Sequence, residues 1–515
     1  MSQIIEQSIR KIAKGTTIVF VGTIVGMLSH FGARLLFARF FSQSQYGIFS
    51  LVVIVLNIAT VIATLGFDQG STRQIAHSRG KGDAVKVQGL ISSSLQLALI
   101  ASILVSVMLF FTSGIISTEI FHEPGLALSL KIVVLAIPFY VLTKVLGAIF
   151  LGFDEVKPKV YFEQISWNIL FLLLLVLVIL LRLPFQAGIL AFSAAFILTG
   201  IGFAVYAQKK APLTARRYPA IAPQGKELLL FSLPLVGVTM LGMVTDSTGS
   251  LMLGFFKTAE EVGLYNGAVP LARLVPIALS STVLIYLPVI SELYSQHLMA
   301  EIKRTYQVLT KWIFTVSLPL FLLLFLFPET VLNFFFGSQY AEAAMALRIL
   351  SLGFMFHAFF GPNGMTLLAM GKSRQVLWAN LLAAGLNVIL NLILIPQWSI
   401  TGAAIASLIS YLALNTFQSV KLYQLSKIHL FTKSYLKPIL ASGTIIAVIY
   451  VLTRSFLVVS YWMLPLIFIL FLGVYGLCLV LTKSFDKEDI MILVEAGKRM
   501  GINVEPVKRI LDKFL

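Results

Sequence analysis

Charged residues are scarce in this chain. Only 12% of its 515 residues are Asp, Glu, Lys or Arg, whereas 58% are hydrophobic, and an average soluble domain is about a quarter charged. Cysteine is scarcer still: Cys478 is the single one, so no disulfide can form within the chain. A soluble fold could not cover this much apolar surface, so the composition favours a membrane protein.

Acidic residues are the scarcer of the two charged kinds. The chain has 22 Asp and Glu against 39 Lys and Arg, for a formal net charge of +17. A basic balance indicates nucleic-acid binding only when the basic residues cluster on one folded surface. Here they lie between long apolar runs, so we expect no nucleic acid partner. Gly-rich phosphate-binding loops and metal-ligand motifs are also missing, so we expect no cofactor and no direct use of ATP.

Long apolar runs are what the sequence has instead. They are about twenty residues long, enough to cross a hydrocarbon core of about 30 Å as helices. With the N-terminus inside, most of the basic residues fall in cytoplasmic segments, as expected for membrane proteins. This pattern predicts an all-α polytopic membrane protein of about fourteen transmembrane helices with both termini cytoplasmic. The predicted spans are 16–37, 47–67, 89–112, 130–151, 162–181, 187–207, 229–256, 264–290, 310–335, 344–370, 376–395, 400–424, 436–457 and 462–482.

The two halves of the chain repeat one another. Phe40-Phe41-Ser42 followed by Tyr46-Gly47-Ile48-Phe49-Ser50 corresponds to Phe255-Phe256-Lys257 followed by Val262-Gly263-Leu264-Tyr265-Asn266. Six predicted spans separate equivalent points, an even number, so both halves enter the membrane in the same direction. The repeats are therefore parallel and related by an axis along the membrane normal.

The repeat predicts the domain organisation. Two six-helix lobes are joined by a basic cytoplasmic linker and followed by two further helices and an amphipathic cytoplasmic tail. The predicted bounds are 1–210 and 229–425 for the lobes, 211–228 for the linker, 426–482 for helices 13 and 14, and 483–515 for the tail.

Several short motifs resemble one known family. They are Lys11-Ile12-Ala13-Lys14-Gly15, Ala38-Arg39-Phe40-Phe41, the repeated Tyr46–Ser50 and Gly263–Asn266 segments, Gly371-Lys372-Ser373, Asn387-Val388-Ile389-Leu390-Asn391 and Gly402-Ala403-Ala404-Ile405-Ala406. Together they resemble the polysaccharide exporter family, which includes O-antigen-type flippases and shares a superfamily with lipid II flippases and MATE exporters. The resemblance implies a twelve-plus-two helix plan and a monomer, with a cavity lined mainly by the first, second, seventh and eighth helices.

Polar residues within the spans are the candidate site, because an ionisable group in a span costs about 3 kcal/mol on insertion scales. His30 and Arg34 share one face of the first span. Asn57 corresponds at an offset of 216 to Arg273, and the resemblance implies that both face the cavity. The candidate cavity residues are Arg273, Arg34, Lys144, Asn57 and His30.

Each of these residues also has a structural interpretation. Lys144 could extend to the cytoplasmic interface, Arg34 could anchor the external one, and His30 could be a neutral packing residue. Asp246 is either an ion-coupling carboxylate or a salt-bridge partner of Arg34 or Arg273.

Glycine and proline predict where two spans deform. Gly361-Pro362-Asn363-Gly364 should break the tenth span, and three prolines should bend the eighth. These prolines are Pro270, Pro276 and Pro288.

Charge sign separates the functional alternatives. Deep basic residues suit the anionic headgroup of an oligosaccharide linked to polyprenyl or dolichyl (pyro)phosphate, which a flippase would move to the external leaflet by alternating access. A MATE-like Na⁺- or H⁺-coupled antiporter would need cavity carboxylates, and Asp246 is the one clear deep candidate. An enzyme would need paired carboxylates or a metal-binding loop outside the hydrocarbon, and the sequence offers neither. We therefore expect a flippase of the cytoplasmic membrane. Its expected partners are lipid-linked oligosaccharide and membrane lipids, with Na⁺ or H⁺ and glycan polymerases or ligases as further candidates.

Overall fold

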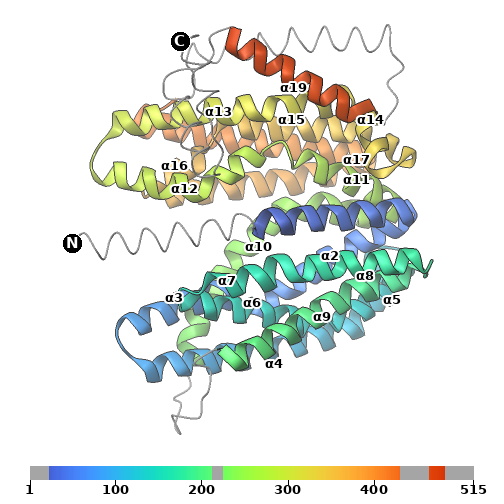
Figure 1. Ribbon diagram of the computed structural model, residues 1–515, viewed down its shortest axis with the longest axis vertical. Coiled ribbons are helices and arrows are strands. Elements are labelled where there is room, and N and C mark those ends of the chain that lie inside the picture. The colour runs from blue at the N-terminus through green and yellow to red at the C-terminus, as the bar shows by residue number, and fades with distance from the viewer. Residues whose placement is uncertain (1–21, 211–223, 430–462, 482–515) are drawn as a thin grey trace. The chain divides into compact units, whose positions relative to one another are not determined.

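The computed structural model describes residues 22–210, 224–429 and 463–481. Every regular element within these ranges is helical (Figure 1). The chain forms two compact units, residues 1–263 and 264–515. The predicted span 436–457 and the predicted amphipathic tail lie outside the described residues.

The first described helix of the first unit covers residues 22–40. The helices that follow it in this unit are α2 (Gln43–Thr64), α3 (Phe67–Gly80), α4 (Ala84–Ile115), α5 (Gly125–Val134), α6 (Ile137–Gly152), α7 (Val156–Lys159), α8 (Trp167–Leu180), α9 (Phe185–Lys210) and α10 (Gly225–Phe256), with π-helices η1 (Ile116–Ile120) and η2 (Val160–Ser166). Helix α11 (Ala259–Ala272) starts in this unit and ends in the next.

The second unit continues with helices of more varied length. They are α12 (Ile277–Ser295), α13 (Met299–Leu326), α14 (Pro328–Phe336), the 3₁₀-helix η4 (Ser338–Ala343), α15 (Ala344–Phe360), α16 (Asn363–Ala369), α17 (Ser373–Ser426) and α19 (Leu464–Leu481).

Helices occupy every predicted span that the structure describes. Eight of the described helices are long and apolar enough to cross a membrane, or nine if the bent pair α5 and α6 counts as one span. One face of α4 illustrates why: Leu104, Met108 and Phe111 recur at helical spacing and are 64%, 68% and 77% exposed. A stripe of this kind is stable against lipid and costly against water. The all-helical membrane fold is therefore confirmed, while the count of fourteen spans and the side of the termini stay predictions.

The predicted break in the tenth span is confirmed. Helix α15 ends at Phe360, Gly361 has a φ of +66°, and α16 starts at Asn363. Glycine adopts this left-handed conformation without steric cost, and Pro362 cannot donate the hydrogen bond that would continue the helix.

The eighth span also deforms near proline, and another proline lies just after the eleventh span. Helices α11 and α12 are separated at residues 273–276, and Pro276 is the N-cap of α12, whereas Pro270 and Pro288 lie inside α11 and α12. In α17, Ser399 has a φ of 47° and a ψ of −127° three residues after Pro396. This kink divides α17 into the two helices that the sequence predicts at 376–395 and 400–424.

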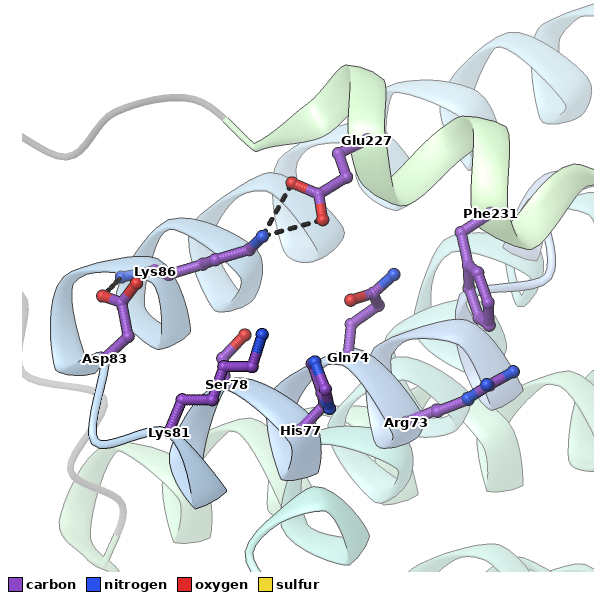
Figure 2. A pocket seen from close by; sticks show the side chains of 9 residues that line it. All are labelled: Arg73, Gln74, His77, Ser78, Lys81, Asp83, Lys86, Glu227 and Phe231. Carbon is purple, nitrogen blue, oxygen red and sulfur yellow. Dashed lines mark hydrogen bonds and ion pairs between the residues drawn. The ribbon is translucent and has the colours of Figure 1, made fainter.

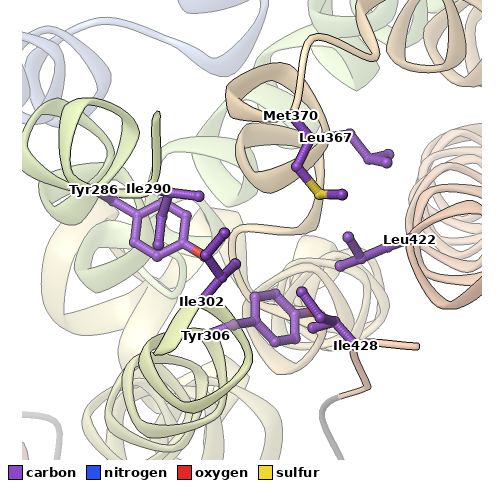
Figure 3. Packing of buried hydrophobic residues seen from close by; sticks show 8 residues of the cluster. All are labelled: Tyr286, Ile290, Ile302, Tyr306, Leu367, Met370, Leu422 and Ile428. Atoms are coloured by element: carbon purple, nitrogen blue, oxygen red, sulfur yellow. The ribbon is translucent and has the colours of Figure 1, made fainter. Parts of the chain in front are cut away.

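Aromatic stacking and buried hydroxyl bonds hold the units together internally. In the first unit Phe37 stacks on Phe49 with ring centroids 4.2 Å apart. In the second, apolar side chains from α12, α13, α16 and α17 form one cluster (Figure 3). The Tyr286 hydroxyl lies 2.8 Å from Thr366 Oγ1, and the Tyr306 hydroxyl donates to the Phe360 carbonyl at 2.6 Å. These bonds satisfy polar groups that burial would otherwise leave costly.

Two repeat-equivalent glycines meet within the first unit. A Cβ on Gly47 would overlap the carbonyl oxygen of Ala259, and a Cβ on Gly263 would overlap that of Gln43. The contact is thus reciprocal, and small residues of this kind let helix backbones approach closely in membranes. This close packing therefore explains why both copies of the repeat have glycine at this position.

Candidate functional site

The polar face of the helix over residues 22–40 packs on η2 and α8. Thr23 Oγ1 donates to Gln164 Oε1 at 2.9 Å, and the His30 ring meets Trp167 edge-on with centroids 5.6 Å apart. Gly26 lies so close to the Gln164 carbonyl that a Cβ there would overlap it. This face is therefore a protein contact from Thr23 to His30.

Arg34 lies one turn beyond His30 on the same helix and is partly buried. Its Nε atom is buried and has no hydrogen-bond partner in the part of the chain that the structure describes. A buried donor without a partner costs about 1–3 kcal/mol. A bound water or an anionic ligand would recover that cost, so Arg34 keeps its place as a candidate binding residue.

Lys144 is paired with a buried carboxylate that the sequence analysis does not single out. Its Nζ lies 3.2 Å from Glu163 Oε2, and Lys159 Nζ lies 3.6 Å from Glu163 Oε1. The Glu163 side chain is only 6% exposed, against 31% for Lys144 and 26% for Lys159. Tyr140 flanks the group, with its ring centroid 5.5 Å from Lys144 Nζ. We call these three charged residues the Lys144–Glu163–Lys159 cluster.

Local backbone features make room for this cluster. Glu163 lies in the π-helix η2, and π-helical turns often occur at functional positions. Gly147 of α6 faces the carboxylate, where any Cβ would overlap Glu163 Oε1. Glu163 lies at the start of the predicted span 162–181, so an acid inside a span was a signal that the sequence already contained.

The other predicted residues lie apart from this cluster. Asn57 is half-buried on α2, Asp246 is exposed on α10, and Arg273 is exposed at the break between α11 and α12. Arg273 belongs to the second unit and the others to the first. No hydrogen bond or ion pair within the described ranges joins Lys144 to His30 or Arg34. A cavity shared by the predicted residues remains a prediction.

The second unit contains a buried amide network. Asn363 Nδ2 donates to the Asn415 carbonyl and to Ser419 Oγ, each at 3.1 Å, and His357 Nδ1 lies 3.1 Å from Asn415 Oδ1. Asn363 follows the break at Gly361, so its amide links the broken tenth span to α17. Asn391 Nδ2 donates to the Asn387 carbonyl at 2.7 Å, which accounts for that motif as helix-internal pairing.

Residues 22–210, 224–429 and 463–481 contain no group of three or more His, Cys, Asp or Glu arranged to hold a metal ion.

An all-helical bundle with apolar outer faces and buried polar clusters defines a multi-pass protein of the cell membrane. A family model described as "Polysaccharide biosynthesis protein" matches residues 12–294, and a second, described as "MatE", matches residues 219–393. The chain belongs to the polysaccharide biosynthesis protein family, so the family resemblance of its motifs is confirmed.

Curated relatives share parts of the chain. Uncharacterized membrane protein MJ1068 of Methanocaldococcus jannaschii is 29% identical over 208 residues, which cover 38% of this chain and 40% of that protein. Stage V sporulation protein B of Bacillus subtilis is 21% identical over 417 residues, 76% of this chain and 80% of the relative. The "Probable low-salt glycan biosynthesis flippase Agl15" of Haloferax volcanii is 27% identical over 168 residues, 32% of this chain and 35% of the relative.

Solved structures share the fold. A lipid II flippase MurJ in an inward closed conformation has a TM-score of 0.71 at 14% identity, covering 90% of this chain and 97% of that one. An inward-facing MATE family transporter has a TM-score of 0.65 at 14% identity, covering 79% and 99%. At this identity the similarity is one of fold.

Proposed function

We propose that this protein is a flippase that carries a lipid-linked oligosaccharide from the cytoplasmic to the external leaflet by alternating access. The carrier is a polyprenyl or dolichyl (pyro)phosphate. The family match over residues 12–294 carries the proposal. The printed name of the Haloferax volcanii relative and the fold shared with a lipid II flippase point the same way.

The charges of the candidate site suit an anionic substrate. Guanidinium groups bind phosphate oxygens through paired N–H donors, and these bonds are strongest away from water. Arg34 has a buried donor without a protein partner in the described residues, and Arg273 is exposed at a helix break. In the proposed mechanism these two arginines hold the (pyro)phosphate while Asn57 and His30 contact the sugar.

The Lys144–Glu163–Lys159 cluster has a different part in this proposal. Two lysines against one glutamate leave one net positive charge, so Lys144 attracts an anion less than an unpaired lysine would. We propose that the cluster balances charge around the transport path and that Glu163 positions the Lys144 side chain.

A Na⁺- or H⁺-coupled multidrug antiporter is the second candidate, because the MatE family model matches residues 219–393. Such a protein needs a carboxylate available to a cationic substrate. Glu163 already holds two lysines, and Asp246 is the remaining candidate in the predicted site. We therefore rank the antiporter below the flippase. We propose that Asp246 couples the flippase to Na⁺ or H⁺. We also propose that the flippase works as a monomer.

Leaflet-resolved glycan analysis tests the proposal. We expect cells depleted of the protein to accumulate lipid-linked oligosaccharide in the cytoplasmic leaflet, and Arg273→Ala to reproduce at least a tenfold loss of export. Arg374→Ala, which removes an exposed arginine at the start of α17, is the matched control and should export normally. Normal export in depleted cells together with altered sensitivity to cationic drugs would favour the antiporter instead.

A further inference from the structure

The first unit contains a cavity that none of the residues discussed so far lines. It has a volume of about 420 Å³ and lies where α3 ends, α4 begins and α10 begins (Figure 2). Cavities of this size hold small ligands in other proteins. Its lining residues are Arg73, Gln74, His77, Ser78, Lys81, Asp83, Lys86, Glu227 and Phe231.

Both carboxylates of this cavity are already engaged within the protein. Lys86 Nζ lies 2.7 and 2.9 Å from the two oxygens of Glu227. Asp83 caps α4, and its Oδ1 accepts the Lys86 backbone N–H at 2.9 Å. Figure 2 shows both contacts on the same side of the cavity. The charge of Glu227 is therefore compensated by Lys86, and that of Asp83 is offset in part by the positive end of α4.

Three basic side chains remain on α3 and just after it. Arg73, His77 and Lys81 form no ion pair with a carboxylate of the described residues. Arg79, which the cavity does not include, is by contrast paired with Asp154. The cavity therefore retains cationic donors, and Ser78 and Gln74 add neutral ones.

Phe231 of α10 orients one of these donors. The Arg73 guanidinium carbon lies 5.0 Å from the centroid of the Phe231 ring. Stacking on a ring occupies the face of a guanidinium and leaves its N–H edges available for paired hydrogen bonds. An arginine held in this way matches a phosphate group.

We propose that this cavity binds a phosphate group, with Arg73, His77 and Lys81 as donors and Phe231 as the support for Arg73. The ligand is either the headgroup of an anionic phospholipid or a soluble phosphate compound. The predicted topology puts this end of α3 on the cytoplasmic side, where both occur. The inference does not rest on the proposed function, because the site is built within one unit and apart from the predicted transport path.

Two binding measurements on the full-length protein test the site. The first titrates inorganic pyrophosphate by calorimetry into protein in phosphatidylcholine nanodiscs. The second counts, by native mass spectrometry, the phosphatidylglycerol molecules retained from mixed micelles. The test variant is Arg73→Gln with Lys81→Gln, and the control, Lys303→Gln with Arg374→Gln, removes the same charge from residues outside the cavity.

We expect the wild type and the control to bind pyrophosphate or to retain phosphatidylglycerol, and the test variant to bind at least tenfold more weakly. If pyrophosphate binds, a phosphate group is sufficient for binding. If phosphatidylglycerol is retained and pyrophosphate does not bind, the ligand is a phospholipid headgroup. Both measurements are repeated in an Arg273→Ala background, which weakens the proposed transport site. The tenfold difference between the test variant and the control should persist there, which separates this cavity from the proposed transport path.

Absence of both activities in the wild type, or equal loss in test and control variants, would overturn the proposal. If the double variant does not fold, Lys81→Gln alone serves, because Lys81 is exposed. Phe231→Leu adds a further check, since it should weaken binding while it leaves every charge in place.

Discussion

Glu163 illustrates at the scale of one residue how burial and charge act together. Its carboxylate is 6% exposed and lies within 3.6 Å of two ammonium groups. An isolated carboxylate at this position would lose more hydration free energy than the surrounding protein could return. Glu163 stays charged there because both lysines compensate it. Removing the carboxylate would leave two cations facing each other.

We therefore expect Glu163→Gln to lower stability by about 1–3 kcal/mol, less than for a fully buried pair because both lysines keep some contact with solvent. Thermal unfolding of the purified protein in detergent measures this. Glu292→Gln, at an exposed position of α12, is the control and should leave the midpoint unchanged. Adding Lys144→Gln to Glu163→Gln should restore part of the loss; if the double variant is less stable than Glu163→Gln, the pairing argument is wrong.

At the scale of helices, the crossing at Gly47 and Gly263 is tighter than any side chain allows. Gly47→Ala would force the start of α2 away from Ala259, and overpacking of this kind costs about 1–3 kcal/mol. We expect a lower yield of folded protein and a lower thermal midpoint for Gly47→Ala, and the same for Gly263→Ala.

Gly385→Ala is the matched control for this crossing, because no atom of another described segment lies within 4 Å of a Cβ at that position of α17. Alanine also favours helix over glycine by up to about 1 kcal/mol. Equal behaviour of Gly47→Ala and Gly385→Ala would contradict the account of the crossing.

Most of the helices could be predicted from the sequence, because the length of an apolar run and the positions of helix-breaking residues are local properties of the chain. The break at Gly361-Pro362 and the division of α17 follow from backbone preferences of a few neighbouring residues. The pairing of Lys144 with Glu163 could not be predicted in the same way, since it depends on how α6 packs against η2. The same holds for the cavity between α3, α4 and α10, where Arg73 of α3 meets Phe231 of α10 across 158 positions of sequence.

At the scale of the whole molecule, the fourteen-span arrangement predicts the side on which each loop lies. We expect a membrane-impermeant maleimide to label Glu119→Cys in intact cells and Lys81→Cys only after permeabilisation. Both positions are exposed, and both variants are made in a Cys478→Ala background. Labelling of the two positions from the same side would contradict the predicted topology, and the cysteine-free parent gives the background signal.

The π-helix η2 limits which insertions and deletions the segment between α7 and α8 can accept. A π-helical turn holds one residue more than an α-helical turn, so the helix faces before and after η2 are out of phase by one position, roughly 100° around the axis. The residues of α7 before η2 and those of α8 after it, such as Trp167, which meets His30, therefore face other directions than they would in a continuous α-helix. Deleting one residue of η2 would turn α8 by roughly 100° relative to α7, so the length of this segment, and not only its side chains, fixes which residues of α8 face the helix over residues 22–40.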